Sequence, residues 1–123
     1  MAWDNPTIQE GTNLADADYS AVANQFKLVK LSATGVVLAG AGELAFGSLY
    51  NRPASGEQAD VAQGVCKVLA GTAGVARGNA ITPEAGGAGV VAGTGDEIVG
   101  RALSAAAAGE FFTMEYAREG ESA

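Results

Sequence analysis

The chain has 123 residues, with 14 acidic and 7 basic side chains and a formal net charge of −7. A chain of this length normally folds as one domain with a modest core. The acidic balance argues against nucleic acid, whose binding depends on clustered lysine and arginine, and against an anionic membrane surface. No apolar run is long enough to span a bilayer. The 18 glycines indicate a thin core, which fits a protein that its neighbours stabilise.

The supply of catalytic and metal-binding side chains is small. The chain has no histidine and a single cysteine, Cys66. Zinc sites and nucleophiles activated by histidine therefore cannot be built. Cys66 lies among apolar residues, which predicts a buried, inert thiol in a protein made in a reducing cytoplasm. We expect no enzymatic activity, no cofactor and no metal site.

Residues 1–24 differ from the rest of the chain. They carry scattered acidic and apolar residues without the alternation of a strand, and they lack the features of a signal peptide. A frayed terminus and an arm that orders on a partner are both compatible with this pattern. In the second case Trp3, Ile8 and Leu14 would serve as apolar anchors. One or two helical turns are expected within residues 14–23.

From residue 25 onward, short β-branched and apolar segments alternate with glycine-rich turns, as is typical of β-strands. In chain order, strands are expected within 25–31, 35–43, 44–50, 58–70, 78–89, 90–93, 97–103 and 110–116. Gly47 is expected at a bulge or a close approach between strands, and Gly64 at a bend. The tail, residues 118–123, is expected to be polar and disordered.

The last predicted strand alternates clearly. Phe112, Met114 and Tyr116 share one face, and Thr113 and Glu115 share the other. Many short strands at regular spacing predict an all-β fold, a small β-barrel or β-sandwich.

One stretch of the chain occurs twice. Gly42 recurs as Gly95, 53 positions further on, and residues of about 37–63 match those of about 90–116 without a gap. Two copies are too few for a solenoid. We therefore expect two similar halves within one β domain of residues 25–117, preceded by an extended N-terminal arm.

The duplication also pairs acidic residues, Glu43 with Asp96 and Glu57 with Glu110. Paired carboxylates can form an acid–base dyad or a calcium site. Each of these acids follows a glycine, however, and that pattern is typical of a turn with a solvated charge. Turns are therefore favoured over a catalytic pair.

The duplicated segment resembles the small capsid decoration, or cement, proteins of tailed bacteriophages. The resemblance covers about residues 25–116, and its motifs are "FGSL" at 46–49, "GE" at 56–57, the strand of residues 61–67, "ARGNAIT" and "GDEIVGRAL". Each motif is simple, and the resemblance rests on their order and spacing.

This resemblance implies a structural role on the virion. Such proteins are small, mostly β and often homotrimeric, and they bind the outer surface of an icosahedral head where capsid subunits meet. The partner would be the major capsid protein, with no nucleic acid or membrane involved. An N-terminal arm commonly grips the shell, so Trp3, Pro6, Ile8 and Leu14 are the candidate capsid-binding residues.

Two other functions remain open. One is another virion surface component, such as a fibre base. The other is a carbohydrate-binding β module, which would normally expose tryptophan or tyrosine on the face of its barrel. The chain's only tryptophan is Trp3, in the arm, which counts against the sugar module.

Overall fold

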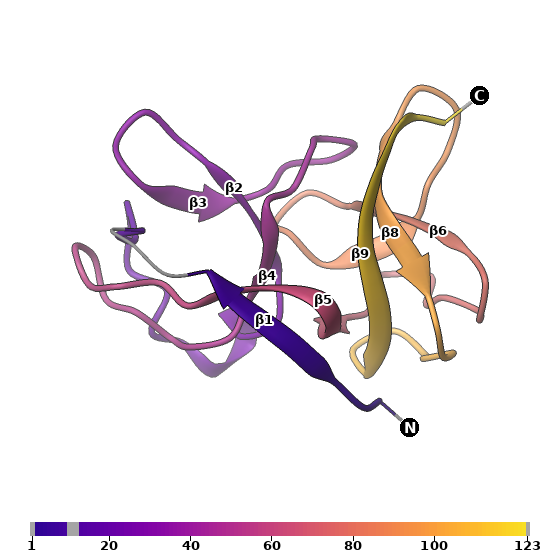
Figure 1. The fold of residues 1–123 in the computed structure, drawn as a ribbon, viewed down its shortest axis with the longest axis horizontal. Helices are drawn as coiled ribbons and strands as arrows, with labels where there is room; N and C mark the ends of the chain where they lie inside the picture. The colour runs from indigo at the N-terminus through magenta and orange to yellow at the C-terminus, as the bar shows by residue number, and fades with distance from the viewer. Residues whose placement is uncertain (1, 10–12, 123) are drawn as a thin grey trace.

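The structure is a computed structural model that describes residues 2–9 and 13–122. Within these residues it contains nine β-strands and one short 3-10 turn, so the prediction of an all-β fold is confirmed (Figure 1). The elements are β1 (Asn5–Gln9), η1 (Val22–Asn24), β2 (Leu28–Leu31), β3 (Val36–Leu38), β4 (Gly47–Leu49), β5 (Val61–Leu69), β6 (Ala80–Pro83), β7 (Gly89–Val91), β8 (Glu97–Ala102) and β9 (Phe111–Glu121). Of the helical turns expected within 14–23, only the beginning of η1 is present.

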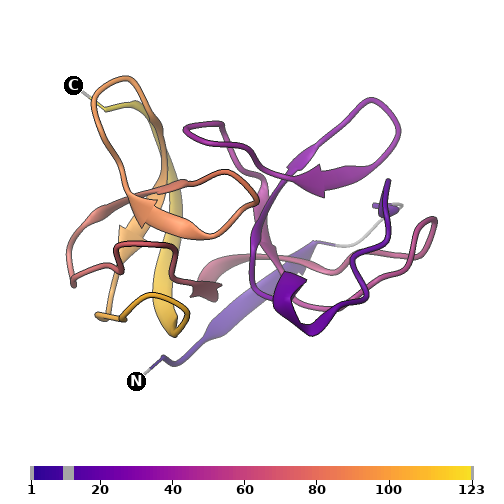
Figure 2. The same cartoon turned by 180° about the vertical axis from the view of Figure 1, so that it is seen from behind.

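The strands form two halves with the same plan. The sheet follows the order β3-β2-β4-β5-β9-β8-β6-β7, and all of these neighbours are antiparallel. In the first half β2 pairs with β3 and β4, and β4 pairs with β5; in the second half β6, β7, β8 and β9 repeat these pairings. The front and back views show the two halves side by side (Figures 1 and 2). The structural repeat therefore extends beyond the duplicated sequence segments of about 37–63 and 90–116, because β2 begins at Leu28 and β9 ends at Glu121.

Strand β5 belongs to both halves. Its residues 61–65 pair with β1, and its residues 65–69 pair with β9. Val61 and Ala62 pair with β4 as well as with β1, so these two strands lie on opposite edges of β5. Gly64 has a φ of +74°, where a side chain is disfavoured, and the expected bend lies there. Before this bend β5 is the last strand of the first half, and after it β5 pairs with β9 of the second half.

The segment after β1 is part of the body of the protein. Ala15 donates its N–H to the carbonyl of Glu57 at 2.9 Å, and Ala70 donates its N–H to the carbonyl of Glu110 at 2.8 Å. These are equivalent bonds in the two halves, so the chain around Ala15 starts the first half as the chain around Ala70 starts the second. Residues 1–24 are therefore not one extended arm, because their second part is built into the fold.

The polar tail is ordered as strand. β9 continues to Glu121, which pairs with Glu97 of β8, and the Arg101 guanidinium binds the Glu119 carboxylate at 2.8 and 3.0 Å. The prediction of a disordered tail over residues 118–123 is wrong for the part that the structure describes. Both faces of this end of β9 are exposed, so the apolar alternation that indicates a strand is missing.

The main core joins the two halves. Its fully or almost fully buried members come from both of them: Leu28, Ala39, Ala45, Ala62, Cys66, Val68, Ala70, Val75, Ile81, Val99, Ala102, Phe112 and Met114. A smaller cluster of Val29, Val36, Leu49, Ala59 and Val61 lies within the first half. Cys66 is buried as predicted, and burial raises its pKa to about 12.

Candidate functional site

The duplicated acidic residues close turns. In four turns a carboxylate accepts the backbone N–H of the residue three positions earlier. The donor–acceptor pairs are Gly40–Glu43, Ala54–Glu57, Gly93–Asp96 and Ala107–Glu110, at 2.6 to 3.0 Å. The residue before each acid is a glycine with positive φ, which the turn requires. The duplication of these acids thus has a structural cause, and residues 2–9 and 13–122 contain no cluster of metal-binding side chains.

The arm that remains outside the two halves comprises residues 2–9, and it is docked on the body through strand β1. It runs antiparallel to β5, with Asn5 opposite Val65 and Ile8 opposite Ala62. The sequence predicted no strand here, because Pro6 removes a backbone donor and the segment is mostly polar. Within the described residues β1 pairs with β5 alone, so its second edge is open.

The Trp3 backbone clamps a buried hydroxyl on β9. The N–H of Trp3 donates to Oγ1 of Thr113 at 2.6 Å, and this hydroxyl donates to the carbonyl of Trp3 at 2.7 Å. Thr113 points away from Phe112 and Met114, as predicted, yet it is fully buried because the arm covers it. The docked arm therefore satisfies a polar group that would otherwise need water.

A second hydrogen-bonded contact holds the arm at Asp4, the residue after Trp3. The Tyr50 hydroxyl donates to the Asp4 carboxylate at 2.7 Å and accepts the backbone N–H of Lys67 at 2.7 Å. Burial raises the pKa of Tyr50, and the bond to Asp4 acts in the same direction. The hydroxyl thus remains a donor at neutral pH, and it holds the arm to β5.

The four predicted contact residues are placed differently by the structure. Trp3 and Ile8 are 51% and 39% exposed, which is unusual for such large apolar side chains. Pro6 lies on β1 with Ile8 and is half-buried. Leu14 is also half-buried, and its carbonyl accepts the N–H of Val36 at 2.8 Å, so it takes part in the first half of the fold. The structure brings the first three together on the arm and sets Leu14 apart.

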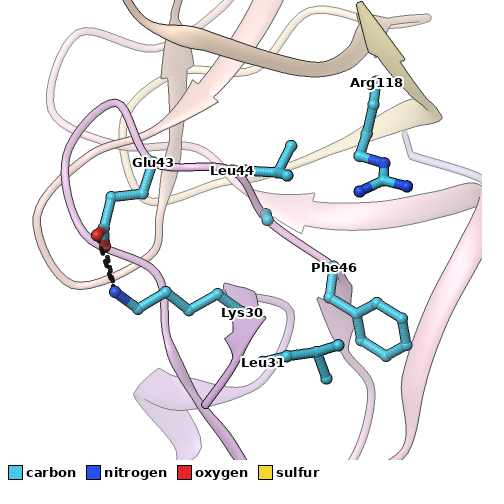
Figure 3. Close-up of a pocket in the computed structure, with 7 residues that line it drawn as sticks. Lys30, Leu31, Glu43, Leu44, Phe46 and Arg118 are labelled. Carbon is cyan, nitrogen blue, oxygen red and sulfur yellow. Dashed lines mark hydrogen bonds and ion pairs between the residues drawn. The ribbon is translucent and has the colours of Figure 1, made fainter. Parts of the chain in front are cut away.

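A surface groove that the sequence did not indicate lies between the two halves. It holds about 330 Å³ and is lined by Lys30, Leu31, Glu43, Leu44, Ala45, Phe46 and Arg118 (Figure 3). Lys30 forms an ion pair with Glu43 at 2.8 Å, and this pair, with the Gly40 N–H, lowers the pKa of the Glu43 carboxyl. Leu31 and Leu44 are 56% and 40% exposed.

The groove joins residues that are far apart in the chain. Residues 30–46 come from the first half and Arg118 from β9, so only the fold places them together. One signal of the groove was present in the sequence. Leu44 stands where the second copy has Glu97, so an apolar residue replaces an acidic one at an exposed position.

Comparison with known proteins finds likeness in structure only. No protein-family model matches the chain, and no curated protein sequence is similar to it. A solved structure described as the N base of the head fibre gp8.5 of bacteriophage phi29 is similar, with a TM-score of 0.72 and 15% sequence identity. The likeness covers 95% of this chain and 100% of that one. At this identity it shows a shared fold. In the part of the chain that the structure describes, no helix is long and apolar enough to cross a membrane.

Proposed function

We propose that this chain is a structural protein of the virion surface of a tailed bacteriophage. It binds the outside of the icosahedral head and stabilises the shell where capsid subunits meet. The observation that carries this proposal is the likeness of nearly the whole chain to the base of a phage head fibre, which that base matches over its full length. The resemblance of residues 25–116 to capsid decoration proteins points the same way.

The arm, residues 2–9, supplies the contact with the shell in this proposal. Ile8 exposes apolar surface on β1, a strand whose second edge is open within the described residues, and Trp3 exposes apolar surface just before this strand. An open edge can pair with an extended segment of a partner, and exposed large side chains can fill its pockets. The partner in this proposal is the major capsid protein, and three copies of the chain assemble at each binding position. Repetition over the lattice then adds avidity to weak single contacts.

A fibre base is the second candidate. The structural neighbour is described as the N base of a head fibre, so this role explains the likeness at least as well as decoration does. The two roles differ in what lies above the shell. Cryo-electron microscopy of heads carrying the protein would show compact density alone for a decoration protein, and density continuing outward for a fibre base.

The first experiment is cosedimentation of the purified protein with phage heads that lack it. We expect saturable binding at a fixed ratio to capsid subunits. Replacing Trp3 and Ile8 together by alanine should weaken binding by about tenfold or more, because buried anchors dominate such contacts. The matched control is Val22→Ala, which removes apolar surface from an exposed residue of η1 outside the arm.

Point variants are preferable to a truncation at residue 25. Such a truncation would remove Ala15, whose backbone closes the first half. If the unaltered protein binds no head, attachment to the shell is discarded. If the double variant binds like Val22→Ala, the shell contact lies elsewhere than on the arm.

A further inference from the structure

The groove exposes apolar side chains to solvent, and the fold does not need apolar residues at these positions. Leu31 and Leu44 are exposed on its walls, and Arg118 and the half-buried Phe46 line the same hollow (Figure 3). The second half has Glu97 in the place of Leu44, so the same fold accepts a charged side chain there. Exposed apolar groups gathered in a hollow are typical of a contact surface.

Arg118 gives the groove an unbalanced positive charge. Lys30, at the other side, is already paired with Glu43 at 2.8 Å. The Arg118 side chain has no ion pair or hydrogen bond within residues 2–9 and 13–122. A matching occupant therefore carries an apolar side chain with a carboxylate next to it.

This combination is present at the start of β9. Phe111 is 44% exposed, and its ring is held edge-on against Phe26 with centroids 5.1 Å apart. Glu110 precedes it and is exposed; its Oε1 accepts the Ala107 N–H, and the carboxylate carries a second oxygen. A ring fixed in position loses little freedom on docking, which favours binding.

The two surfaces cannot meet within one molecule. Phe111 and Arg118 lie on the same strand, seven positions apart. At strand spacing this is roughly 23 Å. Any contact between them must therefore join two copies of the chain.

We propose that the groove receives the Glu110–Phe111 corner of a second copy of this chain. The Phe111 ring packs between Leu31 and Leu44, and the Glu110 carboxylate binds the Arg118 guanidinium of the neighbour. The contact uses two different surfaces, so copies join head to tail and form a closed ring when the rotation between them closes.

Charge reversal tests this contact directly. The mass of the particle in solution is measured by sedimentation velocity at several concentrations. The unaltered protein should associate, and Arg118→Glu or Glu110→Arg should each weaken association by about tenfold or more, since each places like charges together. The double variant Arg118→Glu with Glu110→Arg restores opposite charges and should recover most of the association.

The internal repeat provides the controls. Glu110→Arg also removes a turn contact, and Glu57→Arg removes the equivalent contact in the first half without touching either surface. Arg77→Glu reverses an exposed arginine in another turn. Both controls should associate like the unaltered protein.

A further variant, Leu44→Glu, gives the groove the residue that the second half has at Glu97. It should fold, as circular dichroism and thermal unfolding would show, and it should associate more weakly. The proposal is overturned if the unaltered protein stays monomeric at the highest concentration reached. It is also overturned if Arg118→Glu and Leu44→Glu associate like the controls, or if the charge-swapped double variant remains as weak as the single ones.

Discussion

Two glycines at equivalent places show how closely neighbouring strands approach in each half. A Cβ atom added at Gly47 would lie 2.5 Å from the carbonyl oxygen of Ala62, and one added at Gly100 would lie 2.4 Å from that of Glu115. Neither glycine has a left-handed φ, so the requirement comes from space alone. The expected close approach at Gly47 is therefore confirmed, and the duplication repeats it.

Adding a methyl group at these glycines should destabilise the protein. Gly47→Ala and Gly100→Ala are each expected to lower the free energy of unfolding by about 1–3 kcal/mol, because the paired strands must move apart. Gly93→Ala is the control, since its nearest neighbour is Oδ2 of Asp96 at 3.4 Å and its φ is not left-handed. Urea unfolding measures all three. Equal stability of Gly47→Ala and the control would mean that the strands separate without cost.

At the scale of elements, the sequence predicts the strands from β2 to β8, but it does not predict β1 or the end of β9. The strands from β2 to β8 alternate glycine-rich turns with β-branched residues, so local patterns indicated them. β1 was missed because it is a short edge strand containing Pro6, stabilised by bonds to β5 that the sequence does not display. The end of β9 was missed because its charged residues face solvent on both sides.

The candidate site was only partly predictable for a similar reason. Trp3 and Ile8 were identified as anchors because large apolar side chains in a polar segment are informative alone. The groove depends on Arg118 lining the same hollow as residues 30–46, and the fold brings them there by pairing β9 with β5. The hydrogen bonds of the Thr113 hydroxyl could not be predicted either, because they join it to the backbone of Trp3, which any residue at that position would provide.

The two hydrogen bonds between the Thr113 hydroxyl and the Trp3 backbone should hold the arm in place. Thr113→Val keeps the shape of the side chain but cannot bond the N–H and carbonyl of Trp3, so the arm should detach from β9. We expect a loss of about 1–2 kcal/mol in the free energy of unfolding. The fluorescence of Trp3, the only tryptophan, should shift to the red, and proteolysis of the arm should accelerate.

The matched control is Thr72→Val, which removes an exposed hydroxyl far along the chain that bonds Glu84. Its Trp3 emission should be unchanged. If Thr113→Val leaves the emission and the cleavage rate at the values of this control, the Thr113 hydroxyl does not hold the arm, which then docks through the β1–β5 pairing and the bond between Asp4 and Tyr50.

At the scale of the whole molecule, the shared strand and the shared core determine how the repeats behave. β5 closes the first half and opens the second, and Val68 on this strand packs in the cluster that contains residues of both halves. Val36 lies in the small cluster confined to the first half. Separate stability of the two halves would require each to keep β5, which one chain cannot provide twice.

The protein should therefore unfold as one cooperative unit despite its duplication. Val68→Ala and Val36→Ala should each lower stability by roughly 2 kcal/mol, because each leaves a buried cavity. Amide hydrogen exchange of β2 reports the first half and that of β6 the second. Both strands should lose protection equally in both variants, since global unfolding limits their exchange. If Val36→Ala accelerated exchange in β2 while β6 kept its full protection, the halves would be independent units, and the shared strand would couple them less strongly than its pairing on both sides implies.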